Sequence, residues 1–158
     1  MTDSEQAAAL ARALPYGGAP LDGVATAGQM SEAQVDQLAK AGYRVIVDLR
    51  APQEQRGYDE RAAVERAGME YVTLPVTPET LVDATFDRVR ELLKDREKRP
   101  IVVHCQSANR VGGVMLPFLV LDEGRTPEDA LALAGEIGLR NPDYARMAID
   151  YVRRHAAG

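Results

Sequence analysis

The sequence predicts an α/β fold, in which helices cover both faces of a central, mostly parallel sheet of four to five strands. Short apolar runs such as "VIVDL" and "IVVHC" alternate along the chain with longer segments whose apolar residues recur at helical spacing. These runs begin with three consecutive apolar residues, which is typical of parallel strands buried on both sides. Such alternation favours three layers, with the sheet between two layers of helices.

The composition bounds the size of the protein and its partners. With 158 residues, 46% of them hydrophobic and 27% charged, the chain is long enough for one globular domain with a sizeable core. The net charge of -5 gives no bulk attraction to nucleic acid or anionic lipid, so an anionic ligand needs a local group of positive charges. No apolar run approaches the ~20 residues of a membrane span, and the N-terminus lacks the apolar core of a signal peptide. We therefore expect a cytoplasmic protein with no membrane partner.

Cysteine and histidine are scarce. One cysteine excludes an internal disulfide framework, and one cysteine with two histidines makes a structural zinc site implausible. A lone thiol is typical of a reducing compartment.

The first half of the chain contains an arm and alternating elements. Residues 1–20 are expected to form a flexible arm that ends in the breaker cluster "PYGGAP", and residues 21–158 a single domain. A helix at residues 31–42 is marked by the capping-box pair Ser31 and Gln34. The other elements expected here are strands near residues 23–29, 43–50 and 70–76 and a helix at residues 59–68.

In the second half, residue pairs ending in proline predict where helices begin. Thr77 and Pro78 predict a long helix whose apolar residues recur at helical spacing. The other elements expected here are an apolar strand at residues 101–105, an apolar helix at residues 110–124 and two helices that start at Thr126–Pro127 and Asn141–Pro142.

The segment "HCQSANRVGG" places the only cysteine at the end of a buried strand and an arginine in the first turn of the next helix. This edge of an open α/β sheet is where ligands bind. The backbone N–H groups between the two would curl around one point and add to the positive end of the helix. We expect Cys105 at the floor of this loop, held as a thiolate by that field and by Arg110. A thiolate is a nucleophile, so chemistry on an anionic substrate is predicted. The loop residues are Gln106, Ser107, Ala108 and Asn109.

Several side chains around the loop are further candidates. His104 alternates with Cys105 along the strand, so we expect it to point away from the loop, to bond to the protein and to tune the thiolate. Asp48 and Arg50 end the preceding strand at the same edge of the sheet. Arg50 either contacts the anion or forms a surface ion pair with Asp48 or Glu54. Within the loop, Ser107 is expected to donate to the sulfur and Asn109 to adopt a left-handed conformation, which Asn tolerates.

The segment "VVHCQSANRVGG" resembles the active-site loop of cysteine-dependent phosphatases of the dual-specificity type. More closely, residues 23–151 are similar to a small bacterial phosphatase-like domain that is also found fused to beta-lactamase-like sulfur dioxygenases. The blocks "TAGQMSEAQVDQLAKAGYRVIVDLR", "GMEYVTLPV" and "VLDEGRTPEDALALAGEIGL" carry this likeness. The resemblance implies a phosphatase-like fold with Cys105 and Arg110 in the catalytic loop. It also implies that Gln29, in the family's "GQ" turn, lines the pocket.

The loop departs from the phosphatase signature in its length. Phosphatases have five residues between Cys and Arg, whereas this chain has four, the spacing of rhodanese-type sulfurtransferases. A shorter loop loses one amide donor and suits a terminal sulfur better than a phosphoryl group. Phosphatases also protonate the leaving oxygen with an Asp on a neighbouring loop. Here Glu79 and Asp83 are the candidates, and both are expected in the first turns of a helix, where acids favour the macrodipole.

The leading interpretation of the sequence is therefore a sulfurtransferase. Cys105 would take sulfur from thiosulfate or a similar donor and pass it to a thiol or cyanide. A cysteine-dependent phosphatase with a thiophosphate intermediate and a non-catalytic anion-binding module are the alternatives. All three predict a small anionic ligand, and neither reaction needs a metal or an organic cofactor.

Overall fold

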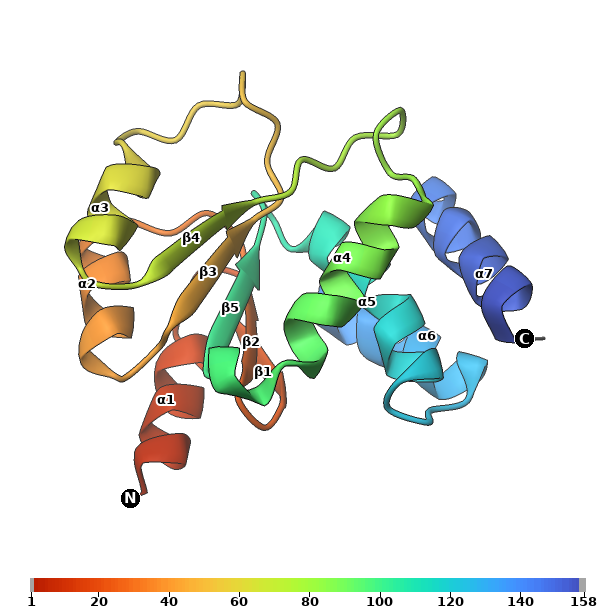
Figure 1. The fold of residues 1–158 in the computed structure, drawn as a ribbon, viewed down its shortest axis with the longest axis horizontal. Coiled ribbons are helices and arrows are strands. Elements are labelled where there is room, and N and C mark those ends of the chain that lie inside the picture. The colour runs from red at the N-terminus through yellow and green to blue at the C-terminus, as the bar shows by residue number, and fades with distance from the viewer. Residues whose placement is uncertain (1, 157–158) are drawn as a thin grey trace.

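The computed structural model describes residues 2–156 and contains a five-stranded sheet with the order β1-β2-β5-β3-β4 (Figure 1). The first strand runs antiparallel to its neighbour and the others are parallel. In the register of the central strands, Val103 lies opposite Thr26 on one side and Val47 on the other. The strands are β1 (Gly18–Leu21), β2 (Val24–Ala27), β3 (Val45–Asp48), β4 (Glu70–Thr73) and β5 (Ile101–His104). The predicted α/β fold with a mostly parallel sheet is confirmed.

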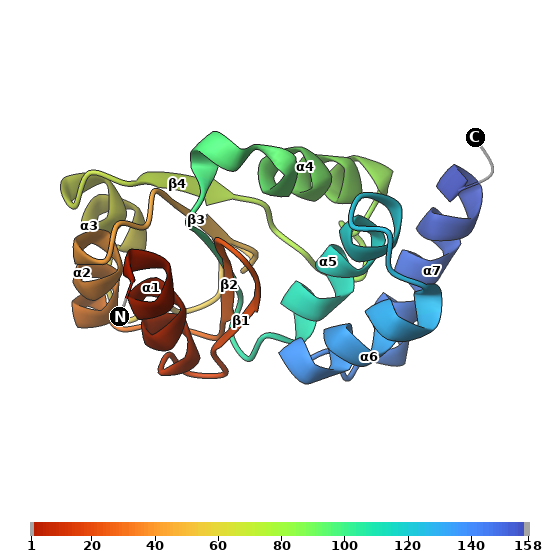
Figure 2. The same ribbon diagram turned by 90° about the horizontal axis from the view of Figure 1, so that it is seen from below.

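Helices cover both faces of this sheet, as the two perpendicular views show (Figures 1 and 2). One face carries α1 (Asp3–Arg12), α2 (Glu32–Lys40) and α3 (Glu60–Arg66); the other carries α4 (Asp83–Lys94), α5 (Asn109–Leu121), α6 (Pro127–Ile137) and α7 (Pro142–Ala156), with a short 3-10 turn, η1 (Arg96–Lys98), before β5. No helix within residues 2–156 combines the length and the apolarity that crossing a bilayer would demand.

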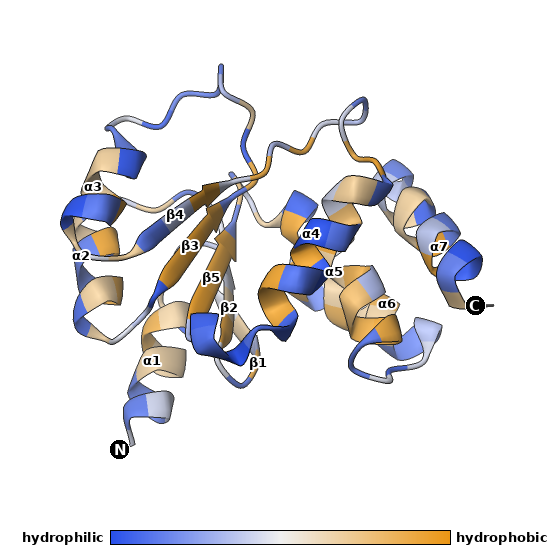
Figure 3. Ribbon diagram, viewed as in Figure 1, coloured by the Kyte–Doolittle hydropathy of each residue, from blue (hydrophilic) through white to orange (hydrophobic). Residues whose placement is uncertain are grey.

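Side chains of the central strands alternate between two cores. Ile46 packs in the core beneath α1, α2 and α3, whereas Val45 and Val47 pack in the core around α5. Both faces of β3 and β5 are therefore buried, which is why these strands read as continuous apolar runs and are coloured as apolar in Figure 3.

Residues 3–21 are packed against the sheet, where a flexible arm was expected. Ala7, Ala11 and Leu14 are buried, and the Tyr43 hydroxyl donates to Ala7 O at 2.8 Å. β1 then pairs with β2, so the structure has no break near residue 20. The physical reason is the small size of the alanine side chains, which lets α1 lie close to its neighbours and bury a narrow apolar face.

Two predicted helix starts are confirmed by their capping bonds. Ser31 Oγ accepts from the Gln34 N–H at 3.2 Å, and Gln34 Oε1 accepts from the Ser31 N–H at 2.9 Å. Thr126 Oγ1 accepts from the Asp129 N–H at 3.1 Å at the start of α6. Each bond satisfies an N–H group that the helix itself leaves unpaired.

The start of α4 was predicted wrongly, since the helix begins at Asp83 and not at Thr77. Thr77 Oγ1 accepts from the Thr80 N–H at 3.2 Å, and Thr80 Oγ1 donates to Pro75 O at 3.2 Å. These hydroxyls close a separate turn and satisfy the donors that a helix cap would satisfy. As a result, Glu79 lies on an exposed loop between β4 and α4.

Candidate active site

The loop after β5 begins at Cys105, at the carboxyl end of a central strand. Cys105 is 1% exposed, and its N–H donates to Ala27 O at 3.3 Å, which extends the pairing with β2. The carbonyl of Gln106 accepts from the Gln29 N–H at 2.9 Å. Gln29 therefore lies beside the loop and contacts it through its backbone.

The peptide N–H groups from Gln106 to Val111 donate to no acceptor within residues 2–156. Several of them are the first N–H groups of α5, a helix of 13 residues, and carry the positive end of its dipole. Unpaired amides of this kind favour an anion, which would satisfy several of them together. The loop above Cys105 therefore has the hydrogen-bonding capacity of an anion site.

The left-handed residue of the loop is Ala108, with a φ of 64°, and not Asn109 as predicted. Asn109 is the first residue of α5. Its Oδ1 accepts from the N–H groups of Arg140 at 2.7 Å and Asn141 at 3.1 Å. Because its side chain bonds to this distant turn, Asn109 keeps a helical backbone and the left-handed turn occurs one residue earlier.

Arg110 is paired with Glu54, from the loop between β3 and α3. Its Nη1 donates to Oε2 at 2.6 Å and its Nη2 to Oε1 at 2.8 Å. These hydrogen bonds raise the pKa of Arg110 and lower the pKa of Glu54. Nη1 also lies 3.4 Å from Val76 O, which leaves the Nε–H and one Nη2 hydrogen without an acceptor in residues 2–156. The sequence did not connect the two residues, since 56 positions separate them.

Tyr144, near the start of α7, lies within electrostatic reach of the groups around the loop. Burial raises the pKa of its hydroxyl, and the charges of Arg110, Cys105, Glu54 and Glu79 also act on it. Cys105 contributes in turn to the raised pKa of Arg110. The loop before α4 approaches the guanidinium at Val76, whose carbonyl lies 3.4 Å from Arg110 Nη1, and Glu79 is exposed three residues further along this loop.

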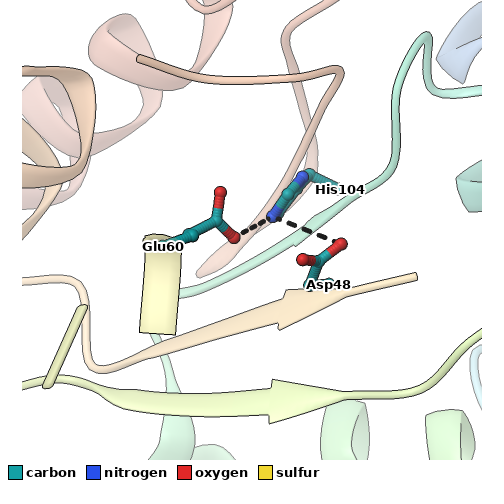
Figure 4. A group of neighbouring side chains, drawn as sticks. All are labelled: Asp48, Glu60 and His104. Atoms are coloured by element: carbon teal, nitrogen blue, oxygen red, sulfur yellow. Dashed lines mark hydrogen bonds and ion pairs between the residues drawn. The ribbon is translucent and has the colours of Figure 1, made fainter. Parts of the chain in front are cut away.

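His104 points into the core on the α3 side of the sheet (Figure 4). Its Nε2 lies 2.7 Å from Glu60 Oε2, and its Nδ1 lies 3.2 Å from Cys105 O. Asp48 approaches the same ring, with Oδ1 3.9 Å from Nε2. The imidazole therefore positions the backbone at Cys105 and does not face the loop.

Arg50 belongs to this buried group. Its Nε and Nη2 donate to Asp48 at 2.9 and 3.0 Å, and Nη2 also donates to Glu60 at 3.0 Å. Of the two roles predicted for Arg50, the structure shows the ion pair with Asp48, and it is buried instead of lying on the surface, with Arg50 1% exposed. Ligand atoms of Asp48, Glu60 and His104 lie within 4.8 Å of one another, a set that a metal could use, but the guanidinium already bonds both carboxylates.

The turn between α6 and α7 packs against the anion loop. Gly138 has a φ of 147°, and a β-carbon there would lie 2.9 Å from both Cβ and O of Ala108. Arg140 Nη2 donates to Ser107 Oγ at 2.8 Å. Ser107, predicted to donate to the cysteine sulfur, is therefore bonded to Arg140. No signal in the sequence pointed to Arg140.

Replacing Gly138 with alanine is expected to lower the free energy of unfolding by about 2 kcal/mol, because the new β-carbon meets Ala108 and the backbone is strained for any other residue. Gly135→Ala is the matched control, because Gly135 lies in the last turn of α6, just before Gly138. A β-carbon there has no neighbour within 4 Å, so we expect it to stabilise by about 0.5–1 kcal/mol. Urea unfolding of both variants measures the difference, and equal stabilities would contradict this close contact.

A buried cysteine at the carboxyl end of a central strand, followed by a loop of unpaired N–H groups within residues 2–156 and an arginine in the first turn of the next helix, is an order shared with the cysteine-dependent phosphatases. The chain belongs to the family described as DSP-PTPase phosphatase fused to NAD+ kinase, which its residues 23–134 match. Arg140 and Tyr144 lie outside the matched residues.

Curated relatives are similar to the chain in sequence, and solved structures share its fold. A beta-lactamase hydrolase-like protein of Xylella fastidiosa strain Temecula1 is 31% identical over 116 residues, which are 71% of this chain and 26% of that protein. The chain thus spans about a quarter of the length of the curated relatives it matches. A DUF442 protein from Shewanella putrefaciens CN-32 has a TM-score of 0.76 at 16% identity, over 93% of this chain and 97% of that one. Tk-PTP in its active form has a TM-score of 0.77 at 18% identity, over 89% of this chain and 98% of that one. The predicted phosphatase-like fold and family are confirmed.

Proposed function

We propose that the chain is a cysteine-dependent phosphatase, which hydrolyses phosphate monoesters through a thiophosphate intermediate on Cys105. The observation that carries this proposal is the run of unpaired N–H groups from Gln106 to Val111, above Cys105 and beside Arg110. Family membership supports it. So do two structural neighbours that contain anions: a TpbA variant of P. aeruginosa with pTyr (TM-score 0.64, 22% identity) and a PP-IP phosphatase of S. cerevisiae with citrate (TM-score 0.71, 11% identity).

In the first step the Cys105 thiolate attacks phosphorus, and the bond from phosphorus to the ester oxygen breaks. The phosphoryl oxygens accept from the loop amides and from the two donors of Arg110 that have no acceptor within residues 2–156. Glu54 orients the guanidinium for this contact through its two bonds. A free thiol as nucleophile fits a reducing compartment such as the cytoplasm.

Glu79 is the proposed general acid. It lies on the exposed loop before α4, three residues after Val76, whose carbonyl accepts from Arg110. Asp83 is a weaker candidate, because both of its oxygens accept from Arg154 at the helix start. Glu79 would give its proton to the leaving oxygen. It would then take a proton from the water that attacks phosphorus and releases Cys105.

Sulfur transfer, the leading interpretation of the sequence, becomes the second candidate. The family and the structural neighbours favour the phosphatase, and the four residues between Cys105 and Arg110 favour sulfur transfer. In that reaction Cys105 attacks the outer sulfur of thiosulfate, the S–S bond breaks and sulfite leaves. A thiol acceptor then takes the outer sulfur from the persulfide. Sulfite is a good leaving group, so this route needs no general acid.

One pair of assays separates the two reactions through Glu79. We expect the wild type to release phosphate from an alkyl phosphate, and Glu79→Gln to slow this about 100-fold, since a poor leaving group needs the proton. With p-nitrophenyl phosphate the loss should be much smaller. Sulfite release from thiosulfate with a thiol should remain slow in both proteins.

Glu128→Gln is the control, because Glu128 is an exposed acid in the first turn of α6. It should leave both rates unchanged. Fast sulfite release that does not depend on Glu79, without phosphate release, would replace the phosphatase by the sulfurtransferase. Activity in neither assay would leave an anion-binding module.

A further inference from the structure

Arg140 differs from Arg110 and Arg50 in having no acidic partner within residues 2–156. Arg110 is neutralised by Glu54, and Arg50 by Asp48 and Glu60. Arg140 forms no ion pair within residues 2–156, although its side chain is exposed beside the loop. In a chain of net charge -5, an arginine left without an acid at the edge of an anion site is a distinct feature.

The position of Arg140 is determined by the loop itself. Asn109 Oδ1 accepts from its N–H at 2.7 Å, and its Nη2 donates to Ser107 Oγ at 2.8 Å and lies 3.4 Å from Ser107 O. The close approach of Gly138 to Ala108 brings the same turn against the loop at a second point. Backbone and side chain are thus both bonded to the anion loop, while the Nε–H and Nη1 hydrogens find no acceptor in the part of the chain that the structure describes.

We infer that Arg140 binds a second anionic group of the substrate. The inference rests on the proposed function and narrows its substrate class to phosphate esters that carry another phosphate or a carboxylate near the reacting one. The loop amides and Arg110 take the reacting phosphoryl group, and the free donors of Arg140 take the second anion. Arg140 is a specificity-determining residue in this arrangement, because it contacts the substrate away from the bonds that change.

Inorganic pyrophosphate and inorganic phosphate are the probes that test this role. Their binding is measured by calorimetry in the Cys105→Ser background, so that nothing is hydrolysed. We expect Arg140→Gln to weaken pyrophosphate binding about 10-fold at low salt and phosphate binding less than about twofold, with the pyrophosphate effect shrinking as salt screens the exposed charge. Arg140→Lys should lose part of the pyrophosphate affinity, since lysine keeps the positive charge and lacks the paired N–H donors of the guanidinium.

Arg153→Gln is the matched control. Arg153 is 76% exposed near the end of α7, and its replacement by glutamine changes the net charge by the same amount as Arg140→Gln. It should alter neither affinity. If Arg140 only supports Ser107, its loss disturbs the loop and weakens the binding of pyrophosphate and of phosphate equally. That result would overturn the inference. Equal affinity of Arg140→Gln and its parent for pyrophosphate also overturns it. If Arg140→Gln selectively loses pyrophosphate affinity but the protein with Cys105 intact hydrolyses no phosphate ester, the inference on Arg140 stands and the proposed phosphatase activity is wrong. Binding of neither anion would remove both.

Discussion

Replacing Cys105 with serine is expected to lower phosphate release at least about 1,000-fold, as removal of a catalytic nucleophile does. A serine hydroxyl ionises far less readily than a thiol, so the variant keeps the shape of the site and loses the attacking group. Inorganic phosphate should still bind, because the amides from Gln106 to Val111 and the guanidinium of Arg110 are unchanged.

Acid-quenched reactions analysed by mass spectrometry provide a second measurement. The wild type should carry one added phosphoryl group on Cys105 during turnover, and Cys105→Ser none. One added sulfur in place of the phosphoryl group would identify sulfur transfer. If the serine variant retains more than a tenth of the wild-type rate with the same unfolding midpoint, the nucleophile lies elsewhere.

The largest loss of stability is expected for Arg50→Met. Arg50, Asp48 and Glu60 are each at most 1% exposed. Removing the guanidinium takes one hydrogen-bonding cation away from both buried carboxylates. Asp48 then keeps its ion pair with Arg56 Nε at 3.2 Å, and Glu60 keeps its contact with His104 Nε2 at 2.7 Å. Removing one partner of a buried ion pair costs about 3–5 kcal/mol, a large part of a typical domain stability of about 5–15 kcal/mol.

Arg61→Met is the matched control, because Arg61 is 56% exposed and pairs with Glu65 one helical turn away. It should cost less than about 0.5 kcal/mol. Urea unfolding at neutral pH measures both variants, and the same small cost for Arg50→Met would show that the buried group contributes little.

The pH dependence of stability gives an independent check on Arg50. Burial alone would raise the pKa of Asp48, but the hydrogen bonds from Arg50, the charge of His104 and the Tyr71 hydrogen bond outweigh it and lower the pKa. A carboxyl with a lowered folded-state pKa stabilises the protein above its unfolded-state pKa, and this contribution is lost as pH falls below about 4. Arg50→Met loses much of it at neutral pH already. The gap in unfolding free energy between wild type and Arg50→Met should therefore narrow as the pH falls.

The elements that local patterns specify were predicted well. β3 and β5 read as continuous apolar runs because both of their faces are buried, and Ser31 and Thr126 stand at helix starts because they pair with N–H groups three residues away. The Thr77–Pro78 pair also predicted a helix start, but a threonine hydroxyl at this position is compatible with either a helix cap or an isolated turn. A hydroxyl that closes a turn satisfies the backbone as well as one that caps a helix, and the packing of Leu81 into the core accompanies the turn.

The candidate site also combines residues that local sequence placed with residues that only the tertiary structure brought together. The order of strand, Cys105, loop, Arg110 and helix lies in one contiguous segment, so the sequence by itself determined that the cysteine ends a central strand and that the arginine stands in the first turn of the next helix. The partners of these groups come from other segments: Glu54 is 56 residues from Arg110, and Arg140 is 33 residues from Ser107. Only the tertiary structure decided these pairs, because hydrophobic periodicity and capping act over a few residues, whereas the partner of a long charged side chain depends on which distant loops the packed core brings beside it.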